Sequence, residues 1–192
     1  MLPMNRIRRF AAPAKYRGTS MLEILVTILI LAIGMLGLAA LQGQAHTSEL
    51  ESYQRAQALV LLQDLSSRME GNINNAASYV TTAIGTGVTD SSDCAGLGTR
   101  AATDLCEWSK ALKGSSEIIG GGTTKQGAMI NGRGCVATTA TNIYLVSVVW
   151  QGLNPTAIPF TTCGQNSYDS EATRRAVTMT ISIPTLSGSQ LP

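Results

Sequence analysis

The stretch GTSMLEILVTILILAIGMLGLAAL, residues 18–41, decides the fold of this chain. Its only charged residue is Glu23, and in the run that follows, residues 24–41, Thr27 is the only polar side chain. Because ~20 apolar residues in a helix cross a bilayer, the run predicts a helix of membrane-spanning length. A carboxylate costs ~2.5–3.5 kcal/mol at the centre of such a helix and less near its end. The position of Glu23 therefore indicates that the chain uses this carboxylate.

The residues before this run form a basic leader. Residues 1–18 have five basic side chains and no acid: Arg6, Arg8, Arg9, Lys15 and Arg17. Since the whole chain has a net charge of +2, the chain without its leader has a net charge of −3. The basic balance therefore does not indicate nucleic-acid binding. A basic flank stays in the cytoplasm, so the arrangement predicts that the C-terminal part is exported.

Three interpretations of residues 1–41 follow from this pattern. A conventional signal peptide has a shorter apolar core of ~7–15 residues, with a small-residue cleavage site after it. A single-pass membrane anchor fits the length of the run. A buried core helix of a soluble protein fits its apolar character, but the basic leader and the position of the cysteines argue against it.

The segment RGTSMLE, residues 17–23, followed by the apolar run resembles the class III signal of type IV prepilins. This resemblance implies that a prepilin peptidase cuts between Gly18 and Thr19, and that the new N-terminus at Thr19 is methylated. Glu23 then becomes the fifth residue of the mature chain. Thr19 departs from the family pattern, in which Phe or Met is commoner at this position.

Thr19 and Glu23 lie one turn apart on one face of a helix, because they are four residues apart. In a filament of the pilin type, we expect the Glu23 carboxylate to meet the α-amine of a neighbouring subunit. Such a pair sets the subunit register in apolar surroundings, because misregister leaves a buried charge unpaired. The alternative is an incidental acid that only favours the helix N-terminus.

Two glycines, Gly34 and Gly37, interrupt the apolar run. Each costs ~1 kcal/mol relative to Ala in a helix. One interpretation is close helix–helix packing in a membrane. The other is a weak zone that unwinds when the helix enters a filament.

The helical pattern continues to Glu70, and Gly71 and Asn72 follow as a C-terminal stop. Apolar residues with spacings of three and four predict a second, amphipathic half of the helix that packs on a globular domain. The predicted apolar face consists of Leu59, Leu62, Leu65 and Met69, and we expect Leu50, Leu59 and Leu62 to be ordinary core residues.

The remaining residues predict a globular domain. Residues 71–133 are rich in Gly, Ser, Thr and Asn, which predicts a connecting region with one short helix at about 103–112. Alternation predicts strands at 135–139, 142–151 and 175–183. We therefore predict a pilin-like α+β fold, in which the second half of the long helix packs on a C-terminal antiparallel sheet. The predicted divisions are a cleaved leader 1–18, a helix 19–70 with its membrane-spanning and filament-core part at 22–41, and a periplasmic domain 71–192.

The four cysteines, Cys94, Cys106, Cys135 and Cys163, all follow the apolar run. An even number in an exported domain predicts two disulfides. Of the three possible pairings, proximity in sequence favours Cys94–Cys106 with Cys135–Cys163. The rival interpretation, a zinc site, lacks a C-x2-C pair, and the single histidine, His46, is distant in sequence. We expect no metal and no cofactor.

Several later segments resemble the minor pilins of the PilV type (type IV pilus modification proteins). They are AIGMLGLAALQ at 32–42, DLCEW at 104–108 with Leu112, GRGCV at 132–136 and VSVVW at 146–150. Loops 71–100 and 152–173 do not contribute. The resemblance implies a structural subunit that primes pilus assembly in a tip-associated complex of minor pilins. It also implies as partners other minor pilins, the major pilin, the prepilin peptidase, the assembly platform and a possible tip adhesin. The implied location is the bacterial inner membrane, with the domain in the periplasm, and then the pilus at the cell surface.

Two other function classes are weighed against this one. A minor pseudopilin of a type II secretion system shares the leader, Glu23 and the long helix, but the disulfides and the PilV-like segments favour the pilus. A membrane-tethered enzyme needs clustered titratable groups, and the domain has none in sequence, so we do not expect an enzyme. For a DNA-binding or adhesive receptor, the nearest basic candidates are Arg174, Arg175, Lys110 and Lys113, which we interpret as solvated surface. The loops closed by the two predicted disulfides are the segments from which we expect partner contact.

Overall fold

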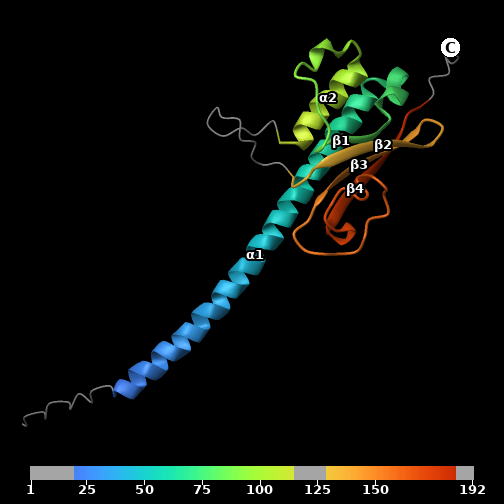
Figure 1. Cartoon of the computed structure of the whole chain (residues 1–192). Helices are drawn as coiled ribbons and strands as arrows, with labels where there is room; N and C mark the ends of the chain where they lie inside the picture. Colours follow the sequence, from blue (N-terminus) through green and yellow to red (C-terminus); the bar gives the residue numbers. More distant parts are fainter. Residues whose placement is uncertain (1–19, 115–128, 185–192) are drawn as a thin grey trace, which may run out of the picture. The chain divides into compact units, whose positions relative to one another are not determined.

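The computed structural model describes residues 20–114 and 129–184 of the protein (Figure 1). It is an α+β structure, in which a long N-terminal apolar helix packs on a four-stranded antiparallel sheet. The protein divides into two compact units between Ala45 and His46. The described helices are α1 (Met21–Glu70), η1 (Ile73–Tyr79), η2 (Ala95–Leu97), α2 (Arg100–Leu112) and η3 (Glu171–Thr173). The described strands are β1 (Thr81–Gly85), β2 (Arg133–Ala140), β3 (Ile143–Gln151) and β4 (Arg174–Ser182).

Helix α1 begins with a polar cap. The Ser20 hydroxyl accepts a hydrogen bond from the Leu22 amide at 3.2 Å, and the Ser20 carbonyl accepts one from the Glu23 amide at 2.9 Å. These bonds satisfy amides that the first turn of a helix otherwise leaves without partners. Thr27 donates its hydroxyl to the Ile24 carbonyl at 2.8 Å, so the one polar side chain of the apolar run is satisfied within the helix. The helix is therefore suited to apolar surroundings along this run.

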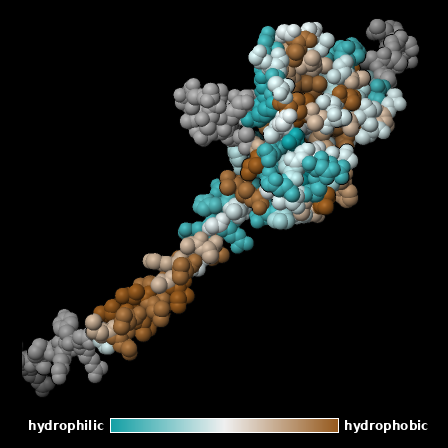
Figure 2. Space-filling model, viewed as in Figure 1, coloured by the Kyte–Doolittle hydropathy of each residue, from teal (hydrophilic) through white to brown (hydrophobic). Residues whose placement is uncertain are grey.

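The apolar residues in the first half of α1 pack against no other part of the described protein. Every large apolar side chain between Met21 and Leu41 is at least 44% exposed. Figure 2 shows these side chains as a continuous brown surface on the visible face of this segment. Within the described residues, the run therefore does not pack as the buried core helix of a soluble protein would.

The second unit has one main core between the helices and the sheet. All neighbouring strands are antiparallel, in the order β1-β2-β3-β4. Buried side chains from α1, α2, β2, β3 and β4 form a single cluster, which includes Leu62, Leu65, Trp108, Leu112, Val136, Val146, Val148 and Ile181. Each fully buried aliphatic side chain of this kind stabilises the fold by ~1.5–3 kcal/mol. In Figure 1 the second half of α1 lies along this sheet beside α2.

One part of the predicted helix face is wrong. Leu50 and Leu59 are 53% and 49% exposed and are not core residues. The buried face runs instead through Gln54, Ala58, Leu62, Leu65, Ser66 and Met69. The N-terminal part of this face consists of Gln54 and Ala58, whose side chains contribute little to a hydrophobic pattern. The sequence pattern therefore placed the larger neighbouring Leu59 on the buried face instead.

The three predicted strands are present, and each boundary differs by two residues or fewer. The prediction missed β1, which is short, ends at Gly85 and has a register shift between Thr81 and Ile84. The short helix begins at Arg100, earlier than predicted, because the Thr99 hydroxyl caps it by accepting a hydrogen bond from the Ala102 amide at 3.2 Å.

A glycine in β2 explains how α2 packs on the sheet. A Cβ atom at Gly134 would overlap the ring of Trp108, which lies against this strand. Trp108 is fully buried, and its indole Nε1–H donates to the Leu61 carbonyl of α1 at 2.8 Å. The segments DLCEW and GRGCV therefore meet in one contact between α2 and β2.

Candidate functional site

The first candidate site is the head of α1. Glu23 is exposed in the first turn of the helix, where the helix dipole favours a negative charge. Its carboxylate has no hydrogen-bond or ion-pair partner among residues 20–114 and 129–184. The predicted cleavage positions Gly18 and Thr19 lie outside the described residues, as does the predicted methylation at Thr19. The site therefore consists of an unpartnered carboxylate at the start of an exposed apolar helix.

The glycines of the apolar run belong to the same surface. A Cβ atom at Gly34 or Gly37 would have no heavy atom within 4 Å. Within the described residues, no contact requires a glycine at either position. Helix α1 is also the helix among the described residues that is long and apolar enough to cross a membrane, which is consistent with a single-pass anchor.

Two disulfides stabilise the second unit. Cys94 pairs with Cys106, and Cys135 pairs with Cys163, with Cα–Cα distances of 5.5 and 5.8 Å. These are the pairings that proximity in sequence favoured. The zinc interpretation is wrong, because all four thiols are in disulfides. The described residues also contain no group of His, Cys, Asp and Glu side chains that could hold a metal ion.

The second disulfide and Arg174 both attach the loop between β3 and β4. The Arg174 guanidinium donates to the carbonyls of Thr161 at 2.7 Å and Cys163 at 3.1 Å and pairs with Glu171 at 2.6 Å. A hydrogen bond from the Asn166 amide and the Arg174 contact lower the pKa of Glu171. The interpretation of Arg174 as solvated surface is wrong, because its side chain is 2% exposed.

The other basic candidates also have internal partners. Lys113 pairs with Asp90 at 2.6 Å, and Lys110 donates to the Ser92 carbonyl at 3.0 Å. Arg175 pairs with Glu51 at 3.4 Å. Lys110 and Lys113 attach a loop to α2, and Arg175 attaches β4 to α1, so these side chains have partners within the protein and are not the free basic cluster that a DNA-binding face needs.

The acids of α2 have a structural role. Arg68, near the end of α1, pairs with Asp104 at 3.1 Å and with Glu107 at 2.6 Å. The Tyr79 hydroxyl donates to Asp104 at 2.5 Å. Burial and then this hydrogen bond raise the pKa of Tyr79. The cluster joins α1, η1 and α2, so both acids help to hold these three elements together.

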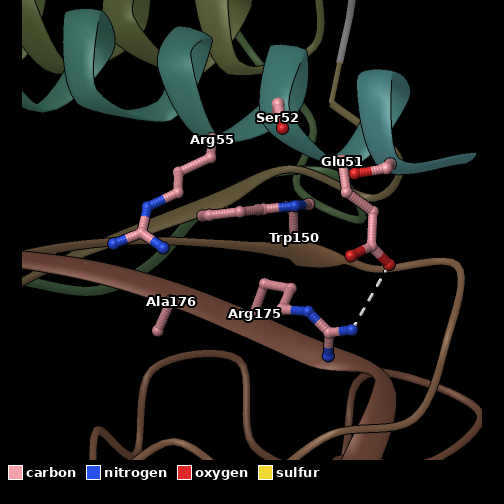
Figure 3. A pocket seen from close by; sticks show the side chains of 7 residues that line it. Glu51, Ser52, Arg55, Trp150, Arg175 and Ala176 are labelled. Atoms are coloured by element: carbon pink, nitrogen blue, oxygen red, sulfur yellow. Dashed lines mark hydrogen bonds and ion pairs between the residues drawn. The ribbon is translucent and has the colours of Figure 1, made fainter. Parts of the chain in front are cut away.

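A pocket between α1 and the sheet is the second candidate site (Figure 3). Its volume is about 250 Å³, and it is lined by Ser48, Glu51, Ser52, Arg55, Trp150, Arg175 and Ala176. Sequence reasoning missed it. The one available signal was the spacing of Glu51 and Arg55, which predicts an ion pair along one helix face. The structure instead pairs Glu51 with Arg175 of β4.

Comparisons of the sequence and structure with protein-family models, with curated proteins and with solved structures return no match.

Proposed function

We propose that this protein is a minor pilin, a structural subunit that primes assembly of a type IV pilus within a tip-associated complex of minor pilins. The observation that carries the proposal is the first half of α1: an apolar helix surface exposed along its length, with one unpartnered carboxylate, Glu23, at its head. The resemblance of residues 17–23 to a prepilin signal supports it. So does the α+β layout, in which the same helix continues into a disulfide-bonded domain.

The proposed mechanism follows from what covers this helix. In the inner membrane, lipid covers the apolar run and the domain is periplasmic. After peptidase cleavage behind Gly18, the assembly platform moves the helix out of lipid and into a filament, where the helices of other pilins replace the lipid. Glu23 then meets the α-amine of a neighbouring subunit, and only the correct register pairs the two charges.

The test is the intact mass of the protein from cells with and without the prepilin peptidase. We expect a peptidase-dependent loss of residues 1–18 and one added methyl group on Thr19. A protein that keeps its leader, or one that is cut after the apolar run, would contradict the proposal.

A second measurement separates a pilus from a type II secretion filament, since both use this processing. Surface pili are sheared from cells and purified, and the protein is measured in them by quantitative mass spectrometry. We expect the processed protein in these pili and unchanged secretion when its gene is deleted. Absence from the pili together with lost secretion would assign the protein to the secretion filament.

A further inference from the structure

We propose that the pocket between α1 and β4 binds a carboxylate carried by a neighbouring protein subunit. The pocket lies wholly within the second unit and is lined by two arginines, one glutamate, one tryptophan and two serines, with Ala176. Its charged side chains therefore sum to +1. In Figure 3, Arg55 enters the view from α1 and Arg175 from β4, with the ring of Trp150 in view between them.

The first argument is a buried donor without an acceptor. Trp150 is 3% exposed, and its indole Nε1–H has no hydrogen-bond partner. A buried donor without an acceptor destabilises the fold, because it has lost its hydrogen bonds to water. The second tryptophan of the domain, Trp108, shows the usual arrangement, since its Nε1–H donates to the Leu61 carbonyl at 2.8 Å. Because this nitrogen is itself buried, an acceptor in the pocket would satisfy it only when the Trp150 ring shifts toward the pocket.

The second argument is a cation that the fold keeps available. Glu51 and Arg55 have the spacing of a helical ion pair. Instead, Glu51 Oε1 accepts hydrogen bonds from the amides of Leu153 at 3.1 Å and Asn154 at 3.2 Å, and pairs with Arg175. Arg55 is left exposed at the pocket, with no ion-pair or hydrogen-bond partner in the described part of the protein.

The chemistry of these donors selects the ligand class. A guanidinium presents a planar pair of N–H groups that match the two oxygens of a carboxylate. The hydroxyls of Ser48 and Ser52 line the same pocket and add neutral donors. Two sources carry this group on a protein: an Asp or Glu side chain, and the C-terminus of a polypeptide. That the source is a neighbouring subunit rests on the proposed function.

The direct test uses the full-length protein, with or without its leader, in detergent micelles and labelled with ¹⁵N, and sodium acetate as the probe. Acetate replaces chloride at constant ionic strength while the two indole N–H resonances are recorded. We expect a saturable shift of the Trp150 resonance and none of the Trp108 resonance, whose N–H already has an acceptor. Equal movement of both resonances, or of neither, would overturn the proposal.

Variants identify the cation. Arg55→Gln should weaken acetate binding at least tenfold, and Arg55→Lys should restore part of it. Arg100→Gln, which removes another exposed arginine far along the sequence, should leave binding unchanged. An unmoved Trp108 resonance in each variant shows that the domain is still folded. Full binding by Arg55→Gln would overturn the assignment.

A cellular experiment distinguishes the two sources. A photo-crosslinking amino acid replaces Ser52 on the pocket rim, filaments are irradiated, and the joined peptides are identified by mass spectrometry. A crosslink to an internal acidic peptide of a pilin would identify an Asp or Glu side chain as the source of the carboxylate. A crosslink to a C-terminal peptide would identify a terminal carboxylate. In either case the yield of the crosslink should decrease with Arg55→Gln. No pilin adduct would overturn the subunit as the source. The acetate titration uses purified protein, so its result does not depend on whether the peptidase cleaves the leader. A failure of this proposal can therefore be distinguished from a failure of the proposed function.

Discussion

The two halves of α1 form one continuous helix, but their apolar side chains have different partners. In the first half, every large apolar side chain between Met21 and Leu41 is at least 44% exposed. In the second half, Ala58, Leu62 and Leu65 are at most 1% exposed within the core of the domain. The difference shows that helical periodicity alone does not say what covers a helix. The domain covers the second half, whereas no described residue covers the large apolar side chains of the first half.

Glu23 gives the largest expected effect, because its proposed partner lies on another subunit. Removing one member of a buried ion pair costs ~3–5 kcal/mol. We expect Glu23→Gln to lower incorporation into purified filaments by about a hundredfold, at an unchanged amount in the membrane. The matched control is Glu49→Gln, an exposed acid in the second half of the same helix, which should incorporate normally. Normal incorporation of Glu23→Gln would remove the functional contrast between the halves.

The same substitution in each half tests the contrast in packing. Leu65 is fully buried, so Leu65→Ala should lower the free energy of unfolding of the domain by ~2–5 kcal/mol. Leu31 is 60% exposed, so Leu31→Ala should change it by less than ~0.5 kcal/mol. Denaturant unfolding of the full-length protein in micelles, followed by tryptophan fluorescence, measures both. Equal effects would mean that the two halves share one core.

The disulfides should stabilise the second unit alone. The bond Cys135–Cys163 spans 28 residues and Cys94–Cys106 spans 12. The loop-entropy model gives about 3.5 kcal/mol for the longer loop and about 3 kcal/mol for the shorter one. We expect the paired Ala variants to lose stability in this order in the same unfolding assay. Hydrogen exchange of the amides of 24–41 should not change, and faster exchange there would contradict the independence of the first half.

The smallest effect is expected at the glycines of the first half. Because a Cβ atom at Gly34 or Gly37 has open space, Ala should stabilise the helix by ~1 kcal/mol per site. Slower hydrogen exchange near each site in micelles would show this gain. Incorporation into filaments should fall if close packing or unwinding needs the glycine. Gly43→Ala, also in open space but beyond the apolar run, is the control and should incorporate normally.

Sequence reasoning predicted most of the elements and part of the candidate site. The helix end at Glu70, the three longer strands and the disulfide pairs follow from local patterns and spacing. Strand β1 was missed because five residues with a register shift give no clear alternation. The burial of Arg174 was missed because its partners include backbone carbonyls of a loop. Every residue has such a carbonyl, so the sequence does not indicate which ones will accept a hydrogen bond.

The sequence by itself determined the long helix, its apolar first half and the place of Glu23, because these depend on neighbours along the sequence. Only the tertiary structure decided which face of the second half is buried. It also decided that Glu51 pairs with Arg175, a residue 124 positions away, and that Arg55 and Trp150 share a pocket. These contacts form when a sheet strand meets a helix, so their energies depend on distances that no local pattern encodes.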